Sequence, residues 1–387
     1  MAGTDLKMVG TMSGARTRLA HRLLAWYRRS KRDLPWRRDR DPYRVWVSEI
    51  MLQQTRVEVV APRFVRFLER FPSVEALARS PIDDVLAEWS GLGYYSRARS
   101  LHAAAQAVHE QHGGRFPRDV EAALALPGIG RYTAGAILSI AYGLPAPIVD
   151  GNVERVLTRV HALAGDPRKA PLKERLWTLA ASLIPPKRAS EFNQALMELG
   201  ATVCLPRGPK CEVCPLSALC KAHERGEPAR FPELKRDERQ VKVRLAALLV
   251  EREGQFLLER RAKTDERGAP AYLRGLWGFP CVEISSDGDI AHLFRRLETV
   301  AGPLQAGTTD MARLGSVRHA ITFRRITLEA FRVSLRNAPR VHMKEARGCW
   351  KWAPLASLGA ELPASSLALK IRSLAERASA SRGARES

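Results

Sequence analysis

Apolar side chains recur at helical spacing through roughly the first 220 residues of the chain. A first helix is predicted over 15–30, where one face is rich in arginine and the other carries Leu19, Leu23, Leu24 and Tyr27. A second helix is predicted over 45–60 from the spacing of Trp46, Ile50, Gln53 and Val57. Shorter alanine-rich helices follow between frequent glycine and proline stops. We therefore expect an all-α domain over 15–220, preceded by a disordered leader at 1–14.

The pattern changes after a charged segment at 221–240, whose prolines suit an exposed linker. Short strands are predicted at 244–250 and 255–260, and apolar–polar alternation predicts another at 326–335. One helix is predicted among these strands, over 290–300. The second domain, 241–372, is therefore expected to be smaller and of the α+β class, followed by a disordered polar tail at 373–387.

The charge of the chain indicates a polyanionic partner. Lysine and arginine number 63 against 41 acidic residues, a formal net charge of +22. Nucleic acid is the usual partner of so basic a protein, and an anionic membrane surface is the alternative. No apolar run reaches the roughly 18 residues of a membrane span, and the first residues carry no apolar signal-peptide core. We expect a cytoplasmic, bacterial nucleoid-associated protein that binds nucleic acid as a monomer.

Four of the six cysteines fall within 17 residues and indicate a metal site. They are Cys204, Cys211, Cys214 and Cys220. A disulfide framework would not explain such clustering in a cytosolic protein. A structural zinc site is one alternative, but zinc sites usually show two close pairs separated by a longer loop. Cys281 and Cys349 are expected to be ordinary thiols outside the site.

The run at 126–135 (LPGIGRYTAG) predicts a tight turn between two helices. Its proline and glycines, among them Gly128 and Gly130, allow the backbone to approach another molecule closely. The second helix begins with free N–H groups and a partial positive charge, so a phosphate can bind there. The run resembles the helix-hairpin-helix that grips DNA in the endonuclease III superfamily of base-excision glycosylases. An ordinary helix–loop–helix is the alternative for the run alone, but Asp150, twenty residues further on, fits the superfamily pattern.

The N-terminal domain more specifically resembles the MutY-type adenine DNA glycosylases. Four motifs in the same order carry this resemblance over 15–220: residues 34–37 (LPWR), 42–55 (PYRVWVSEIMLQQT), 91–99 (GLGYYSRAR) and 192–200 (FNQALMELG). The resemblance implies a helix-hairpin-helix fold and a [4Fe–4S] cluster on the four clustered cysteines, since four thiolates are the right ligand set.

The chemistry of adenine release gives two carboxylates distinct roles. Adenine is a poor leaving group, so its ring must be protonated as the N-glycosidic bond breaks. Glu49 lies in an apolar run, and burial there would raise its pKa and suit it as the general acid. Asp150, also a favoured helix N-cap, would stabilise the oxocarbenium-like sugar. The alternatives are an exposed acid at Glu49 and a plain cap at Asp150. The resemblance implies that Tyr132 and Asn152 support both carboxylates.

The remaining site residues follow from the resemblance. Because the adenine must leave the duplex, a pocket and a wedge are needed. Trp36, Arg37, Leu52 and Gln194 would line the adenine pocket, and Gln53 is expected to be a further substrate-binding residue. Gln54 and Tyr94 would fill or wedge the base stack near the opposing oxidised guanine. For the two aromatic residues, a plain core role is the alternative when each is taken alone.

The second domain resembles the MutT/Nudix-like C-terminal domain of the same family through the run at 275–280 (GLWGFP). Its predicted helix lacks the adjacent glutamates that hold Mg²⁺ in a working Nudix hydrolase, so nucleotide hydrolysis is not expected. The family reads 8-oxoguanine with a Phe-Ser-His loop. The nearest match here is Ile321-Thr322-Phe323, in which Thr322 keeps the hydroxyl while both flanking residues differ.

These observations predict a monofunctional glycosylase that hydrolyses the bond to adenine opposite 8-oxoguanine or guanine in double-stranded DNA. One alternative is an endonuclease III-type glycosylase and lyase acting on oxidised pyrimidines. Such enzymes need a lysine early in the second hairpin helix, and that position holds Tyr132, whose phenol cannot form a Schiff base. The other alternative is a DNA-binding iron–sulfur protein without catalysis, against which both carboxylates argue.

Overall fold

The chain divides into two compact units. The computed structural model describes residues 3–234, 240–260, 275–285, 291, 293–295, 297–298, 309–321, 323–335 and 350–386. The helical unit comprises Met1–Arg79 with Arg99–Asp237, and the C-terminal unit comprises Ser80–Ala98 with Glu238–Ser387. Residues 80–98, which the sequence pattern assigns to the helical domain, are thus grouped with the C-terminal unit. One reason is a two-bonded ion pair between Arg260 and Asp83, with N···O distances of 2.6 and 3.0 Å.

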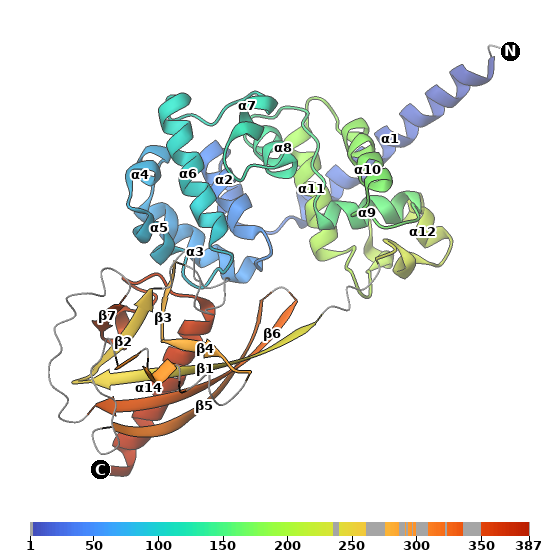
Figure 1. Cartoon of the computed structure of the whole chain (residues 1–387). Coiled ribbons are helices and arrows are strands. Elements are labelled where there is room, and N and C mark those ends of the chain that lie inside the picture. Colours follow the sequence, from blue (N-terminus) through green and yellow to red (C-terminus); the bar gives the residue numbers. More distant parts are fainter. Residues whose placement is uncertain are drawn as a thin grey trace. The chain divides into compact units, whose positions relative to one another are not determined.

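Successive helices enclose the core of the helical unit (Figure 1). In chain order the helices of this part of the chain are α1 (Gly3–Ser30), α2 (Pro42–Leu52), α3 (Val57–Arg70), α4 (Val74–Arg79), α5 (Ile82–Glu88), α6 (Ser96–Gln111), α7 (Val120–Ala125), α8 (Arg131–Ile140), α9 (Gly151–His161), α10 (Ala170–Leu183), α11 (Ala189–Thr202) and α12 (Lys221–Glu224). Of these, α5 lies in the segment that is grouped with the C-terminal unit. The predicted apolar face of α1 is buried throughout, with Leu23 fully inaccessible. None of the helices that the structure describes is long and apolar enough to cross a membrane.

The helix predicted over 45–60 is two helices. α2 ends at Leu52 and α3 begins at Val57, and the turn between them places Gln54 at a φ of 57°. The spacing of Trp46, Ile50, Gln53 and Val57 continues through the turn, so periodicity alone did not reveal the break. At the ends of the chain, α1 begins at Gly3 and α14 (Ser366–Glu386) runs to Glu386, so these helices extend into the segments expected to be a disordered leader and tail. Neither end contains a proline that would stop its helix.

The C-terminal unit is built on one mixed sheet. Its strands are β1 (Val241–Arg252), β2 (Gln255–Arg260), β3 (Trp277–Gly278), β4 (Cys281–Glu283), β5 (Thr309–Ile321), β6 (Arg324–Leu335) and β7 (Trp350–Ala353). The order is β3-β2-β1-β6-β5, with β4 paired to β1 and β7 to β2. β1 runs parallel to β6, while the other pairs are antiparallel. The predicted α+β class of this domain is confirmed.

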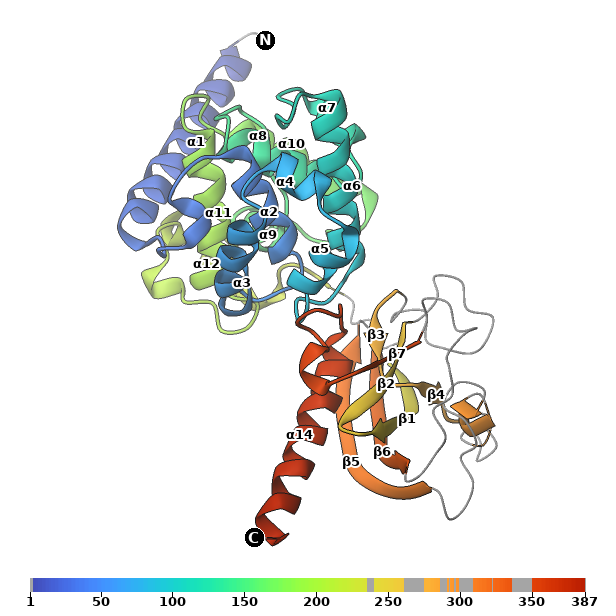
Figure 2. The same cartoon turned by 90° about the vertical axis from the view of Figure 1, so that its left-hand side faces the viewer.

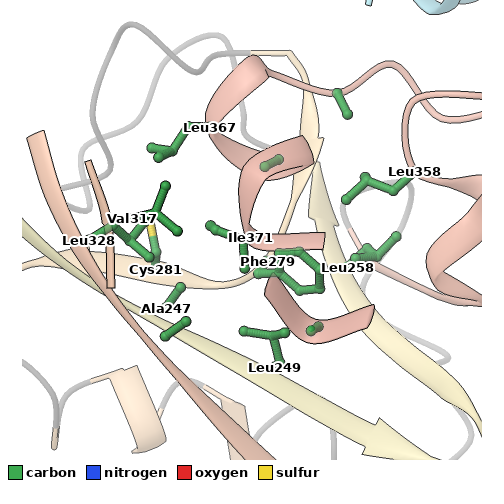
Figure 3. Close-up of a cluster of buried hydrophobic side chains, with 14 of the residues drawn as sticks. Ala247, Leu249, Leu258, Phe279, Cys281, Val317, Leu328, Leu358, Leu367 and Ile371 are labelled. Carbon is green, nitrogen blue, oxygen red and sulfur yellow. The ribbon is translucent and has the colours of Figure 1, made fainter. Parts of the chain in front are cut away.

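Side chains alternate between the two faces of the long strand β1, and both faces are covered. On one face Ala247 and Leu249 pack with Phe279 and Ile371 of α14, which runs along the sheet (Figures 2 and 3). On the other face Leu248 and Val250 pack with Leu293 and Leu297, which belong to the helix predicted over 290–300. Since each face buries apolar area, the sheet forms the core of the unit.

Candidate active site

Helix α2 carries Glu49 into the interior of the helical unit. Asp41 caps the helix by accepting a 3.0 Å hydrogen bond from the Arg44 N–H, and Pro42 occupies the first turn. Glu49 is 5% exposed among the apolar residues of the helix. Burial raises the pKa of Glu49 to about 7, and the nearby Asp150 adds to the rise, while a Tyr132 hydrogen bond and Arg37 oppose it. The carboxyl can therefore hold a proton near neutral pH.

Tyr132 reaches Glu49 from the first turn of α8. Its hydroxyl donates a 2.6 Å hydrogen bond to Glu49 Oε2, and its oxygen lies 3.3 Å from Met197 Sδ. Burial, and then the charge of Glu49, raise the pKa of Tyr132 well above its ordinary value. The phenol therefore stays neutral and acts as a hydrogen-bond donor that holds the carboxylate oxygen of Glu49 in place.

Asp150 is the N-cap of α9 and is held by the start of that helix. Its Oδ1 accepts a 2.8 Å hydrogen bond from the Val153 N–H, and its Oδ2 accepts one of 3.0 Å from Asn152 Nδ2. Arg155 in turn donates to Asn152 Oδ1 at 2.8 Å. Burial raises the pKa of Asp150, while the Val153 and Asn152 hydrogen bonds oppose the rise. These donors stabilise the charged form of the carboxylate and fix its direction.

The two carboxylates line one cavity of about 980 Å³. Ten of the predicted site residues line it together: Trp36, Arg37, Glu49, Leu52, Gln53, Gln54, Tyr132, Asp150, Asn152 and Gln194. They come from the turn at 35–37, from α2 and the turn after it, and from α8, α9 and α11. The volume lies at the upper end of the range of small-molecule pockets. No lysine stands among the described residues that line this cavity.

The pocket side chains are themselves held in position. Trp36 is 7% exposed and packs edge-on against Phe64, with ring centroids 5.6 Å apart. Gln194 accepts a 3.2 Å hydrogen bond from the Tyr27 hydroxyl. Gln53 donates to Thr133 Oγ1 at 3.4 Å, which links the turn after α2 to α8.

The sequence analysis gave no role to Glu198, which organises one wall of the cavity. Its side chain is fully buried and accepts hydrogen bonds from Arg32 and from Arg37, the latter at 2.8 Å. Despite the cost of burial, these donors lower the pKa of Glu198 to about 2. Glu198 therefore directs Arg37 into the cavity wall. Helical spacing could have found it, because Glu198 lies one turn beyond Gln194 on α11.

The hairpin turn before α8 has the backbone that the glycines predict. Gly128 has a φ of 73°, and a Cβ there would lie 2.5 Å from Ser100 Cβ, so this position requires glycine. Gly130 is the N-cap of α8, and a Cβ on it would meet no protein atom within 4 Å. The first turn of α8 thus opens onto free space beside Gly130. That leaves room for the backbone of a partner.

The four clustered cysteines line one small cavity between α9 and the loop that follows α11. Arg159 donates to Cys204 Sγ at 3.3 Å, and burial raises the pKa of Cys214 to about 11. Among the described residues, no three metal-binding side chains are close enough to hold a single ion. Four thiols that line one common space are the ligand set that a four-iron cluster takes.

Two of the predicted catalytic and substrate-binding residues are not among those that line the cavity around Glu49 and Asp150. Thr322 is outside the described residues. Tyr94 belongs to the C-terminal unit, where it is 39% exposed at a φ of 48°. The exposed position of Tyr94 removes the plain core role as an alternative for this residue, whereas the buried Trp36 is both packed and part of the cavity wall.

Comparison with known proteins decides the family. The model of the HhH-GPD superfamily of base excision DNA repair proteins matches residues 47–182. An adenine DNA glycosylase of Rattus norvegicus is 38% identical over 373 residues, spanning 82% of this chain and 71% of the relative. The chain belongs to the adenine DNA glycosylase family. The Homo sapiens adenine DNA glycosylase is likewise 38% identical, over 81% of this chain and 66% of its own length.

Membership makes the chain an adenine DNA glycosylase of base excision repair, an enzyme that hydrolyses N-glycosidic bonds in DNA. The predicted helix-hairpin-helix fold, family and enzyme class are confirmed. The solved structure of a thermostable thymine-DNA glycosylase aligns with a TM-score of 0.51 and 33% identity, over 55% of this chain and 99% of its own. The helical unit of this adenine DNA glycosylase thus has the glycosylase fold.

Proposed function

We propose that this glycosylase releases adenine opposite 8-oxoguanine or guanine in double-stranded DNA, acting as a monomer and without cutting the strand. The observation that carries the proposal is the pair of carboxylates in one cavity, Glu49 in a dry environment and Asp150 among hydrogen-bond donors. Environments that differ in this way suit two carboxylates for an acid role and a charged role.

In the proposed mechanism, protonated Glu49 donates its proton to the flipped adenine as the bond to the sugar weakens. Its pKa of about 7 leaves a useful share of the acid protonated at neutral pH. Asp150, kept ionised and oriented by Val153 and Asn152, stabilises the positive charge that develops at the sugar. Water then attacks the sugar carbon and loses one proton to the now ionised Glu49, and the described residues that line the cavity include no lysine that could attack instead.

We further propose that Trp36, Leu52, Gln53 and Gln194 contact the flipped adenine, and that Gln54 lies near the base that it leaves behind. Each of these side chains lines the cavity. Arg37 faces the same space but is paired with Glu198, so its proposed role is to present a fixed positive edge to the base.

The cluster and the C-terminal unit complete the proposal. The four cysteines would hold a [4Fe–4S] cluster, which when bound would shape the loop at 204–220 as a basic surface for DNA phosphate. The C-terminal unit is proposed to be Nudix-like and to contact the opposing lesion, with Thr322 and the exposed Phe323 at the β5–β6 connection.

The test is adenine release from duplexes that carry adenine opposite 8-oxoguanine, guanine or cytosine, measured in single turnover. We expect the fastest release opposite 8-oxoguanine, slower release opposite guanine and the slowest opposite cytosine. Glu49→Gln should abolish release while retaining duplex binding. Equal rates on all three duplexes would refute the proposed lesion specificity. A borohydride-trapped protein–DNA adduct with accompanying strand cleavage would instead establish the lyase.

A further inference from the structure

A short turn in the C-terminal unit presents an aromatic side chain to solvent. It connects α5 to α6 and places Gly91, Gly93 and Tyr94 at φ values of 89°, 70° and 48°. Tyr94 is 39% exposed. A bulky residue rarely adopts a positive φ, and it persists there only where the surrounding structure enforces it. Contacts with neighbouring residues therefore hold the turn in a backbone conformation that is unfavourable for tyrosine.

Part of that restraint lies within the turn itself. Arg97 stacks on the Tyr94 ring, 5.4 Å from its centroid, and also on Trp89. It donates to the Gly93 carbonyl at 3.1 Å, and Trp89 Nε1 donates to the same carbonyl at 3.2 Å. These contacts fix the turn as one body but do not attach it to the sheet.

Two side chains attach the turn to a single residue of the C-terminal unit. The Tyr95 hydroxyl donates to the Ala364 carbonyl and accepts from the Gly91 N–H at 3.4 Å. The Ser90 hydroxyl accepts a 3.3 Å hydrogen bond from the Ala364 N–H. Both backbone groups of Ala364, a residue with no exposed surface, are thus paired with the two ends of the turn.

Ala364 is itself fixed, because it lies where the sheet meets α14. It forms a parallel bridge with Trp277 of β3, whose N–H donates to the Pro363 carbonyl at 2.8 Å. The next residue, Ser365, begins α14 by accepting a 3.1 Å hydrogen bond from the Ala368 N–H. Through Ala364, the turn is joined to both the sheet and the helix of the unit.

We propose that Tyr95 and Ser90 are positioning residues that hold Tyr94 in a fixed place through Ala364, and that they set the enzyme's selectivity for the base opposite adenine. The inference rests on the proposed function, since it requires discrimination between opposing bases. An aromatic side chain that enters or abuts a base stack distinguishes bases only when its own position is restrained. The restraint comes from the C-terminal unit, while the adenine cavity lies entirely in the helical unit.

The test compares Tyr95→Phe with Tyr142→Phe as a matched control. The Tyr142 hydroxyl also donates to a backbone carbonyl, that of Phe116 at 2.6 Å, but it lies in the helical unit. Rates and apparent Kd are measured in single turnover on adenine opposite 8-oxoguanine and opposite guanine. In Tyr95→Phe, the affinity ratio between the two duplexes should fall roughly fivefold, as expected for one lost hydrogen bond, with the saturating rate unchanged within about twofold. Tyr142→Phe should keep the wild-type ratio.

A double-mutant cycle separates positioning from a general loss of stability. In a Tyr94→Ala background, Tyr95→Phe should cause no further loss of selectivity, because there is no ring left to position. Ser90→Ala should reproduce the effect in the full chain, and in both variants amide hydrogen exchange should quicken around 90–98 and 362–366.

The outcomes distinguish this inference from the proposed function. A wild-type enzyme without preference for 8-oxoguanine refutes both. A selective wild type whose Tyr95→Phe and Ser90→Ala variants keep full selectivity refutes the positioning role alone. If Tyr95→Phe lowers selectivity equally in the presence and in the absence of the Tyr94 ring, the Tyr95 hydroxyl acts on stability only. That result also refutes the positioning role.

Discussion

Removal of the Tyr132 hydroxyl should move the pH dependence of adenine release in a direction that the structure fixes. The hydroxyl donates a 2.6 Å hydrogen bond to Glu49 Oε2 and thereby favours the ionised carboxylate. The hydrogen bond lowers the pKa of Glu49, against burial and the charge of Asp150, which raise it. In Tyr132→Phe the lowering contribution is lost, so the pKa of Glu49 must rise.

The size of the change follows from the strength of that hydrogen bond. A hydrogen bond to a charged group contributes about 1.5–3 kcal/mol, and one pKa unit corresponds to about 1.4 kcal/mol. The pKa of Glu49 should therefore rise from about 7 to roughly 8 to 9. Because the protonated form is the acid, the fall of the rate on the alkaline side should move upward by the same interval. The plateau below it should drop modestly, since a weaker acid transfers its proton less readily.

Single-turnover release of adenine at saturating enzyme, measured from pH 5.5 to 10, checks the prediction. Tyr43→Phe is the matched control, because Tyr43 lies on α2, the helix that carries Glu49, and its hydroxyl donates to the Phe71 carbonyl at 2.8 Å rather than to a carboxylate. The control should keep the wild-type profile. An alkaline limb in Tyr132→Phe that stays in place or moves to lower pH would refute the assignment of Glu49 as the acid.

Three further predictions test the stability of the site and its cofactor. Glu49→Gln should raise the free energy of unfolding at pH 8 by up to about 3 kcal/mol, and this gain should shrink toward pH 5. The reason is that Glu49, with a pKa of about 7, carries its costly buried charge only as the pH rises. Denaturant titrations at pH 8 and pH 5 measure the difference. Glu198→Ala should cost about 3–5 kcal/mol at pH 7 by leaving Arg32 and Arg37 without their carboxylate. The wild type should lose that contribution as the pH falls below about 4.3 toward about 2, where Glu198 itself is protonated. The purified wild type should contain iron and show a broad visible absorbance, and Cys214→Ser should abolish both; a colourless wild type that contains zinc would refute the cluster.

The sequence predicted the parts of the site that depend on local pattern. Asp150 was predicted both as a cap and as a site residue, and the structure shows the cap directly in the hydrogen bond from the Val153 N–H. The hairpin glycines were likewise predicted from their turn, and Gly128 has the positive φ that only such a residue adopts readily. Both features arise within a few residues of chain, where spacing carries the information.

Features that depend on contacts between distant segments were missed. Glu198 lies about 160 residues from its partners Arg32 and Arg37, so its pairing has no local signal. The break between α2 and α3 was missed because Gln54 turns the chain without glycine or proline. The attachment of 80–98 to the C-terminal unit depends on the backbone groups of Ala364. Because any residue has these groups, the amino-acid sequence does not indicate the contact.

The placement of the two carboxylates supports the different roles proposed for them. Each ionised group raises the cost of ionising the other, and the charge of Asp150 indeed raises the pKa of Glu49. What breaks the symmetry is the set of donors. Asp150 accepts from a helix N-terminus and from the Asn152 amide, which favour its charge, whereas the one neutral hydroxyl on Glu49 is too little to offset burial. The proton therefore belongs on Glu49. Since α8, the second helix of the hairpin, supplies that hydroxyl and α9 the donors to Asp150, these two helices set the difference between the carboxylates on which the proposed acid role of Glu49 depends.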